Sequence, residues 1–278
     1  MNLAGKVALV TGASRGVGAA TAVALAQAGC RVACAARSTE AAPQKTPGTL
    51  DETLARIRAA GGEAIAVPTN LAVEAEVVEM VRATAAHFGA LDVLVNNAAI
   101  TFVGDLAIPM KRHDLVMDVN LRAPFIAMRE AVPHMQRAGE GAIVNLSSMA
   151  ALSAIPGLMS YGVSKIALER LTVDVANQLR DQRIACNVFR IDVPVASEGF
   201  VANTPGADRS DWEPCEVAAE GILWMLRQPP SYSGQLASMW GLRQRHGIMA
   251  SRAARPYQGK PVLALQQGLT GRDDSIFT

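Results

Sequence analysis

Short apolar runs alternate along this chain with longer segments in which apolar residues recur every three or four positions. The short runs are typical of strands buried in a parallel sheet, and the longer segments have the period of amphipathic helices. This pattern predicts strands at 6–11, 30–36, 64–68, 92–96, 141–147, 184–190 and 234–238. It predicts helices at 17–28, 50–60, 73–88, 112–137, 160–181 and 214–227.

This alternation predicts an α/β fold: a single doubly wound domain whose seven-stranded parallel sheet carries helices on both faces. A chain of 278 residues is long enough for one such domain. We expect the domain to span 1–245 and a basic C-terminal extension to span 246–278. Ligands of such sheets bind beyond the carboxyl ends of the strands, beside the first strand.

The first predicted strand runs into a glycine-rich turn, Gly12-Ala-Ser-Arg-Gly16-Val-Gly18, and then into a helix. Gly12 permits a sharp turn, Gly16 lets backbone approach a ligand, and Gly18 lets helix and strand pack closely. The N–H groups and the dipole at the start of the helix favour an anion. A purely structural turn is the alternative, but the strand–turn–helix context favours a nucleotide pyrophosphate site.

Tyr161 stands four residues before Lys165 in a helical pattern, so the two side chains share one helix face. An ammonium beside a phenol favours the phenolate and is expected to lower the pKa of Tyr161 from about 10. Such a phenol can pass a proton to or from a carbonyl or alcohol oxygen. Ser148, thirteen residues before Tyr161, can hydrogen-bond the same oxygen, and Asn120 lies upstream of all three.

Together these motifs resemble the short-chain dehydrogenase/reductase family, in its shorter subtype of roughly 250 residues. Thr11 to Gly18 matches the family's Thr-Gly-x-x-x-Gly-x-Gly motif, and Asn96-Asn-Ala-Ala99 matches Asn-Asn-Ala-Gly with Ala99 in place of the glycine. The resemblance runs from about residue 3 to about residue 240. Segments 45–49 and 110–122 are similar to the hydroxysteroid dehydrogenase-like branch of the family.

The resemblance implies a Rossmann-type domain and a catalytic tetrad of Asn120, Ser148, Tyr161 and Lys165. Tyr161 would be the general acid or base, Ser148 would orient the substrate oxygen, and Lys165 would also bond the nicotinamide ribose. Asn120 would hold a water that connects Lys165 to solvent. The implied function is an oxidoreductase that moves a hydride between a nicotinamide and a carbonyl or secondary alcohol. A 3-oxoacyl thioester reductase and a non-catalytic NADP(H)-binding sensor or scaffold are the alternatives.

We expect the cofactor to be NADP(H). Relatives that prefer NAD place an Asp where Ala36 stands, and here Arg37 follows while Arg15 lies in the glycine turn. Two guanidinium groups suit a 2′-phosphate, although both could be solvated surface arginines. Asn70 would replace an Asp that faces the adenine amine. The implied cofactor-binding residues are Gly12, Ser14, Arg15, Gly16, Val17, Gly18, Arg37, Asn70, Leu71, Asn97, Ala98, Tyr161, Lys165, Val195 and Ser197.

The chain departs from the family after the sixth predicted strand. Ile191 and Asp192 stand where relatives have Pro-Gly, and Pro194 removes an N–H close to where relatives donate one to the carboxamide. Ser197 would replace the family's Thr, shifted by one position. The nicotinamide end of the cofactor site is therefore expected to differ more from relatives than the phosphate end.

The expected substrate contacts are Ser148, Met149, Leu152 and Tyr161. Together with Ile155, Leu158, Phe200, Val201 and Trp212, they predict an apolar wall that fits a hydrophobic ketone or alcohol. Alternatively, some of these side chains only pack a loop against the domain.

Composition narrows the remaining possibilities. No run approaches 18 apolar residues, and the start of the chain leads directly into the first strand, so we expect a cytoplasmic protein without a membrane span. A net charge of +1 and the lack of a recognition motif argue against nucleic-acid binding. Four cysteines and four histidines without ligand spacing predict no metal site. The resemblance implies a homotetramer or homodimer.

Charge is distributed unevenly towards the C-terminus. From Gly221 to Arg272 the chain has no Asp or Glu but seven basic residues: Arg227, Arg243, Arg245, Arg252, Arg255, Lys260 and Arg272. This basic segment is expected either to pack on an acidic face of its own or a neighbouring subunit, to attract an anionic substrate such as an acyl-CoA, or to be solvated.

Overall fold

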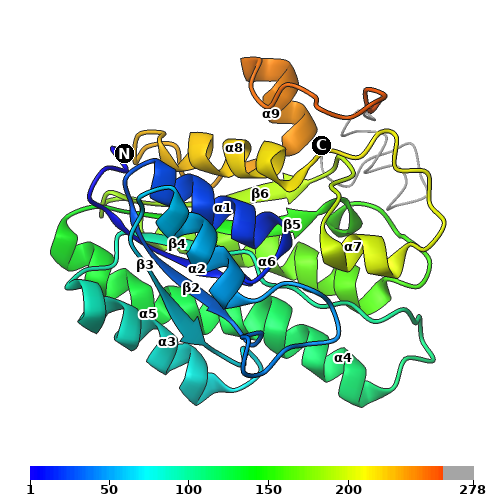
Figure 1. The fold of residues 1–278 in the computed structure, drawn as a ribbon, viewed down its shortest axis with the longest axis horizontal. Helices are drawn as coiled ribbons and strands as arrows, with labels where there is room; N and C mark the ends of the chain where they lie inside the picture. The colour runs from blue at the N-terminus through cyan, green and yellow to red at the C-terminus, as the bar shows by residue number, and fades with distance from the viewer. Residues whose placement is uncertain (259–278) are drawn as a thin grey trace.

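A computed structural model of the chain describes residues 1–258, and its centre is a seven-stranded, fully parallel sheet. The strands are β1 (Val7–Thr11), β2 (Arg31–Ala36), β3 (Ala64–Pro68), β4 (Val93–Asn96), β5 (Gly141–Ser148), β6 (Ile184–Ile191) and β7 (Leu236–Ser238). Their order in the sheet is β3-β2-β1-β4-β5-β6-β7 (Figure 1). Strands β2 and β3 therefore lie on one side of β1 and strands β4 to β7 on the other, so the strand order reverses between β1 and β4. The predicted doubly wound α/β fold is confirmed, with strand ends within two residues of the prediction.

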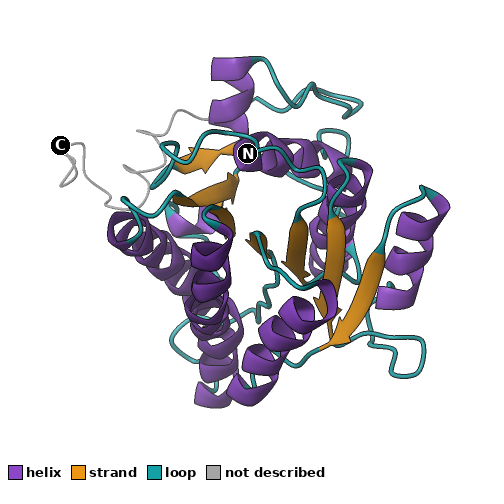
Figure 2. Ribbon diagram, turned by 90° about the vertical axis from the view of Figure 1, so that its left-hand side faces the viewer, coloured by secondary structure: helices purple, strands orange, loops and turns teal. Residues whose placement is uncertain are grey.

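Helices cover both faces of this sheet, as Figure 2 shows from the side. The larger helices are α1 (Gly16–Gln27), α2 (Leu50–Ala59), α3 (Glu74–Phe88), α5 (Ala123–Ala138), α6 (Met159–Gln178) and α8 (Cys215–Leu226). Helices α1, α2 and α8 form one layer, while α3, α5 and α6 form the other.

Alternate residues of each central strand supply the two hydrophobic cores. Ala8 and Val10 face the layer of α1 and α8, whereas Val7 and Leu9 face the layer of α3 and α5. All four are fully buried, as expected for a parallel strand covered on both faces. This burial explains why the strands read as continuous apolar runs rather than as alternating ones.

The helix predicted at 112–137 is not one regular α-helix. The structure has α4 (Met110–Met117), a π-helical turn η1 (Asp118–Arg122) and then α5. Pro124 explains the interruption, because it has no N–H for the carbonyl of Asn120 and its ring would clash with that carbonyl in a regular helix. The wider turn leaves Asn120 fully buried against the loop after β4.

Two short helices were not predicted, α7 (Glu198–Asn203) and α9 (Met239–His246), and η2 (Met149–Ala151) is a further short turn. Both helices begin with a side-chain cap: Ser197 accepts from the Phe200 N–H, and Ser238 accepts from the Gly241 N–H. Six to eight residues are too few for apolar periodicity to separate a helix from a loop.

The C-terminal segment packs back onto the domain through ion pairs. Arg243 reaches the fully buried carboxylate of Glu213 at 2.8 Å, and Arg252 pairs with Glu220. Arg255 lies 3.2 Å from Asp208. For these three arginines, the acidic face is therefore on their own subunit. Lys260, Arg272 and the rest of the predicted extension beyond residue 258 lie outside the described residues, and the boundary at 245 stays a prediction.

Within residues 1–258, no helix is both long enough and apolar enough to cross a membrane. The same residues contain no group of three His, Cys, Asp or Glu side chains arranged to hold a metal ion.

We predict that Arg243→Met lowers the free energy of unfolding by about 3 kcal/mol, because it leaves the buried carboxylate of Glu213 without its cation. Urea unfolding followed by circular dichroism measures the change. Arg255→Met is the matched control, since both Arg255 and its partner Asp208 are largely exposed. Equal losses in the two variants would contradict a structural role for the buried pair.

Candidate active site

The glycine turn lies at the carboxyl end of β1, where α1 begins. A Cβ on Gly18 would lie 2.2 Å from the carbonyl oxygen of Gly12 and 2.4 Å from Nδ2 of Asn97, so no larger residue fits there. Gly16 opens the helix with φ +57°, a conformation that favours glycine. The first turn of α1 has no acidic residue and no side-chain cap, so its N–H groups are available to an anion.

Arg15 lies beneath a loop that folds back over this turn. Its Nη2 donates to the carbonyl of Gly48 at 3.1 Å, and Ser38 Oγ donates to the same oxygen at 2.7 Å. Burial lowers the pKa of Arg15, the carboxylate of Glu198 opposes this, and the positive charge of nearby Arg37 adds to it. The Nε of Arg15 is buried and has no hydrogen-bond partner within residues 1–258. A spare donor beside a second, exposed guanidinium fits a phosphate group.

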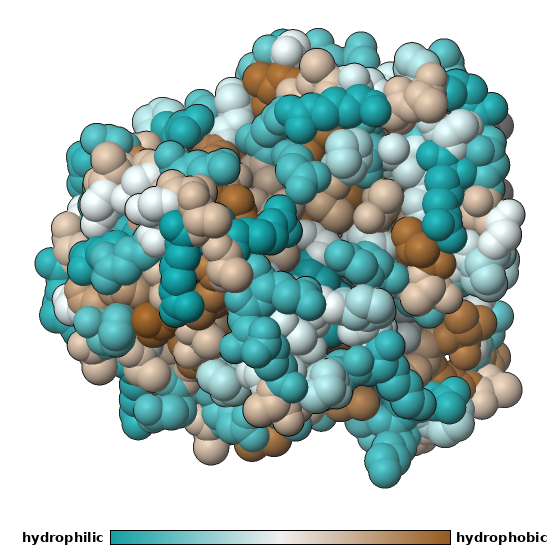
Figure 3. Space-filling model, in the orientation of Figure 1, coloured by the Kyte–Doolittle hydropathy of each residue, from teal (hydrophilic) through white to brown (hydrophobic). Residues whose placement is uncertain are grey.

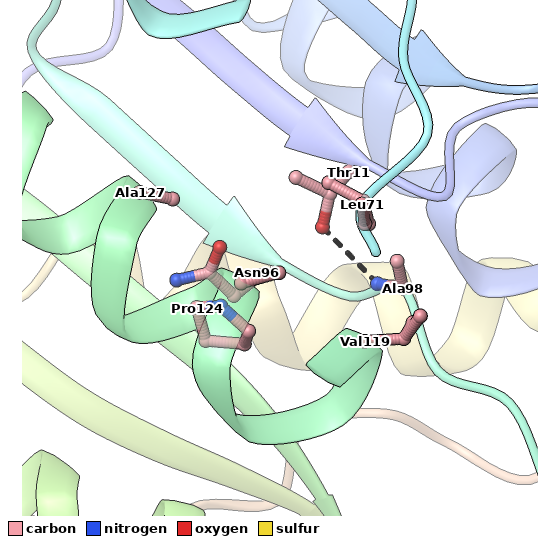
Figure 4. A pocket seen from close by; sticks show the side chains of 8 residues that line it. Thr11, Leu71, Asn96, Ala98, Val119, Pro124 and Ala127 are labelled. Atoms are coloured by element: carbon pink, nitrogen blue, oxygen red, sulfur yellow. Dashed lines mark hydrogen bonds between the residues drawn. The ribbon is translucent and has the colours of Figure 1, made fainter. Parts of the chain in front are cut away.

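The loop after β4 forms a wall beside the glycine turn. The backbone N–H groups of Asn97 and Ala98 both donate to Thr11 Oγ1 at 3.1 Å, and Asn97 Nδ2 donates to the Thr11 carbonyl. Figure 4 shows the Thr11–Ala98 bond beside a narrow cavity that Leu71 and Val119 also line and that is too small for a water molecule. Thr11 thus holds the two predicted cofactor residues rigidly against β1.

Other predicted cofactor-binding residues already form a hydrogen bond within the chain or are buried. Asn70 Oδ1 accepts from the Ala72 N–H at 3.2 Å, which leaves one lone pair for a ligand amine. Ser14 and Val17 are buried within and after the turn, so they present backbone rather than side chain to a ligand. Contact of these residues with a cofactor stays a prediction.

Tyr161 lies in the first turn of α6, and Ser148 ends β5. Burial raises the pKa of Tyr161, while a hydrogen bond with the Ser148 hydroxyl acts in the opposite direction. The expected lowering of this pKa by Lys165 is not found, because desolvation of the phenolate is the largest effect. Tyr161 is therefore a neutral phenol near pH 7, which suits a proton donor.

Lys165 is one helical turn further along α6. Its Nζ lies 5.6 Å from the centre of the Tyr161 ring and donates to the carbonyl of Leu146 at 2.8 Å. Burial lowers the pKa of Lys165 to about 8, whereas the carboxylate of Glu169 raises it. The ammonium is therefore present at neutral pH and is lost as pH rises through about 8.

Asn120 connects the π-helical turn to the loop after β4. Its Oδ1 accepts from the Ile100 N–H at 2.8 Å, and its Nδ2 donates to the Ile100 carbonyl at 2.9 Å and to Ser164 Oγ at 3.1 Å. Ser164 directly precedes Lys165, so Asn120 brings the loop, the π-helical turn and α6 together. Its role in holding a water stays a prediction.

The segment that replaces the family's Pro-Gly has its own anchors. Asp192 accepts from the Trp240 N–H at 2.8 Å, which ties the end of β6 to the start of α9. Val195 forms a bridge with Glu213, and Ser197 caps α7. A Cβ on Gly16 would lie 3.1 Å from Cβ of Ser197 and 3.4 Å from Oε2 of Glu198. The structure therefore brings Ser197 beside the glycine turn, and its contact with a cofactor stays a prediction.

The predicted apolar wall is only partly accessible. Met149 is half-buried directly after Ser148, whereas Leu152 and Trp212 are buried. Phe200 is 42% exposed and stacks on Trp212 with ring centres 4.6 Å apart. Further exposed apolar side chains that the sequence did not single out are Val103, Leu106 and Met110. Apolar surface gathers at the right of Figure 3, on the side of α4 and α7.

A buried cluster behind the tetrad was missed. Glu169 is 1% exposed and accepts from Ser147 Oγ at 2.6 Å and from Arg190 Nε at 2.8 Å. The signal was present, because Glu169 continues the spacing of four from Tyr161 and Lys165. Only the fold reveals that Arg190, on another strand, faces the same helix.

The chain is similar to known proteins both in sequence and in structure. Residues 6–193 match the family model described as short chain dehydrogenase. The chain is 30% identical to hydroxysteroid dehydrogenase-like protein 2 of Danio rerio over 94% of its own length, but it spans only 63% of that relative. It is 38% identical to a 3-oxoacyl-[acyl-carrier-protein] reductase of Synechocystis over 72% of this chain and 76% of that one. A metagenomic short-chain oxidoreductase crystallised with NADP superposes with a TM-score of 0.71 at 30% identity, covering 86% of this chain and 99% of the other.

We predict that Ser148→Ala raises the pKa of Tyr161 further, because it removes the hydrogen bond that favours the phenolate. Ultraviolet difference titration measures tyrosine ionisation, and the same titration of Tyr161→Phe identifies the signal among the three tyrosines. Ser153→Ala is the control, since Ser153 lies outside the strand end that carries Ser148. A lowered pKa in Ser148→Ala would contradict the assigned contact.

Proposed function

The chain belongs to the short-chain dehydrogenase family, and from this premise we propose that it is an NADP(H)-dependent oxidoreductase acting on a hydrophobic ketone or secondary alcohol. The family and its nicotinamide chemistry follow from the match over residues 6–193. The preference for NADP(H) and the substrate class are the proposal. The observation that carries the oxidoreductase itself is that Tyr161, Ser148 and Lys165 meet at the carboxyl end of the sheet, the end that also carries the glycine turn.

The protein groups would divide the chemistry as follows. Bound NADP(H) supplies or accepts the hydride at C4 of its nicotinamide. In reduction, Tyr161 donates its phenolic proton to the substrate oxygen, so that the carbonyl becomes an alcohol and the tyrosine a phenolate. Ser148 donates a hydrogen bond to the same oxygen and stabilises the charge that develops on it. Solvent then returns a proton to Tyr161, and oxidation runs these steps in reverse.

The positive charges near the turn support NADP(H). Arg15 has an unused, buried Nε donor within the described residues, and the charge of Arg37 acts on it. Ala36 ends β2 without a carboxylate that would repel a 2′-phosphate. The metagenomic relative crystallised with NADP is consistent with this choice.

The exposed apolar residues near the site support a hydrophobic substrate. Met149 follows Ser148 directly, while Val103 packs beside Gly157 in the loop that leads into α6. Gly104 and Gly157 join the two loops through a 2.8 Å hydrogen bond. Apolar side chains around a few polar groups are typical of a small-molecule site.

The two alternatives differ in their support. The 3-oxoacyl thioester reductase is supported by the 38% identity to the Synechocystis 3-oxoacyl-[acyl-carrier-protein] reductase. Its argument from the sequence, a free basic segment, is weakened because Arg243, Arg252 and Arg255 are paired with carboxylates of this chain. The sensor or scaffold depended on the altered segment after β6. There Asp192 has a structural partner in the Trp240 N–H, so its presence does not require loss of catalysis.

We predict that Tyr161→Phe abolishes NADPH-dependent reduction of a ketone panel, by at least about 100-fold, because no other proton donor replaces the phenol. NADPH consumption measures turnover, and fluorescence titration should show nearly unchanged NADPH binding. Tyr232→Phe is the matched control, since Tyr232 packs against Trp224 rather than at the sheet's carboxyl end. Retained turnover in Tyr161→Phe would overturn the assignment.

We predict that Arg37→Ala weakens NADPH binding about 10- to 100-fold and leaves NADH binding nearly unchanged, because only NADPH carries the 2′-phosphate. Fluorescence titration with both cofactors measures the difference. Arg58→Ala removes an equally exposed charge from the far end of α2 and should change neither affinity. Equal losses for NADPH and NADH would contradict the proposed contact.

We also propose that the protein forms a homodimer or homotetramer through α5 and α6. Phe125, Met159, Val163 and Ile166 project large apolar side chains from these helices and are 41–47% exposed. Val163→Glu combined with Ile166→Glu should lower the mass measured by light scattering. Leu106→Glu, at an exposed apolar position in a loop, should leave it unchanged. A double variant with the unaltered oligomeric mass would exclude this face as the interface.

A further inference from the structure

A buried ion pair lies directly behind the catalytic candidates. Tyr161, Lys165 and Glu169 follow one another at intervals of four along one face of α6. The Glu169 carboxylate accepts from Nε of Arg190 at 2.8 Å and from its Nη2 at 2.6 Å, a bidentate arrangement. Ser147 Oγ donates to the same carboxylate at 2.6 Å.

Stability alone does not account for such a pair. Both side chains are almost fully buried, with exposures of 5% for Arg190 and 1% for Glu169. Apolar residues of similar volume often stabilise a fold as well as a buried ion pair or better, since both charges must leave water. The position of the pair therefore calls for a further role.

The pair joins the three segments that carry the candidate site. Ser147 precedes Ser148 at the end of β5, and it lies opposite Arg190 in the register of β5 with β6. Arg190 in turn precedes the altered segment that begins at Ile191. Glu169 belongs to the helix that holds Tyr161 and Lys165. A shift of any one segment would break a charge-assisted hydrogen bond in the interior.

The pair also sets the charge environment of Lys165. The ionisable groups around it are Tyr161 and Glu169 on α6. Arg190 on β6 pairs with Glu169, and its positive charge also lowers the pKa of Asp192 at the end of that strand, although burial raises it. Burial lowers the pKa of Lys165 to about 8, and the Glu169 carboxylate opposes this. Without that carboxylate, Lys165 would lose its proton at a lower pH.

We infer that Glu169 and Arg190 form a positioning pair: they hold α6 against β5 and β6 so that Tyr161 meets Ser148, and Glu169 places a carboxylate one helical turn from the Lys165 ammonium. Neither residue touches the reacting atoms. Both act through Lys165 and the helix that carries it. The catalytic part of this inference rests on the proposed function, whereas its electrostatic part can be tested without turnover.

The titration of Lys165 distinguishes this role from a purely structural one. Glu169→Gln should lower the pKa of Lys165, because it removes the nearby negative charge. Arg190→Gln should raise it, because Glu169 then has Lys165 as its neighbouring buried cation. NMR of ¹³Cε-labelled lysine measures both, since the chain has only five lysines and Lys165→Met identifies the signal. Loss of packing alone would move the pKa in the same direction in both variants.

Turnover gives a second readout if the proposed reduction holds. In Glu169→Gln the fall of kcat/KM at high pH should begin about one pH unit lower, so that activity at pH 8 drops about fivefold. Activity at pH 6 should fall less, since Lys165 stays protonated there. Failure of the proposed function would appear as turnover retained in Tyr161→Phe. The Lys165 titration does not require turnover, so it would still test the role of the Glu169–Arg190 pair.

Glu213→Gln is the matched control, because Glu213 forms a second deeply buried pair among residues 1–258, with Arg243. It should lower stability but leave the Lys165 titration unchanged. Should the single variants fail to fold, the double variant Glu169→Gln with Arg190→Gln pairs two neutral amides and should still lower the pKa of Lys165. The inference is overturned if the Lys165 titration is unchanged in the Glu169 variants, or shifts equally in Glu213→Gln.

Discussion

The candidate site depends above all on the polar contact between α6 and the carboxyl half of β5. Three side chains of α6 reach consecutive residues of the strand: Thr172 bonds Asn145 at 2.9 Å, Lys165 bonds the Leu146 carbonyl at 2.8 Å, and Glu169 bonds Ser147 at 2.6 Å. All three contacts are buried, so each would leave an unsatisfied polar group if the helix slid along the strand. Apolar packing alone tolerates small shifts, whereas these contacts specify one register.

From this register the rest of the site follows. Asn145 Oδ1 also accepts from Asn96 Nδ2 at 2.8 Å, so the buried hydrogen bonds that join α6 to β5 continue to β4. After β4, the loop is held by Thr11 on one side and by Asn120 on the other. The glycine turn, the proton donor and the wall between them are thus parts of one hydrogen-bonded structure, and a cofactor laid across them would meet a site formed in advance.

The segment after β6 shows how a chain can lose a family motif and keep its architecture. In place of Pro-Gly, Asp192 binds the start of α9, and Glu213 holds both the bridge at Val195 and the arginine at 243. The basic residues that looked available in the sequence supply part of this anchoring. Basic residues that suggest a ligand site along a sequence can therefore be paired in the fold with carboxylates of the same chain, here the buried Glu213 and the exposed Glu220 and Asp208.

By itself the sequence determined the order of the strands and of the six larger helices, the parallel sheet, the glycine turn and the spacing of Ser148, Tyr161 and Lys165. These features depend on local periodicity and on residues close together along the chain. Only the tertiary structure decided the π-helical turn around Asn120, the partnership of Glu169 with Arg190 and the direction of the Tyr161 pKa. Each of these depends on which distant groups meet and on how much water they exclude. Burial controls hydrogen bonding and charge, and burial is a property of the assembled fold rather than of any segment.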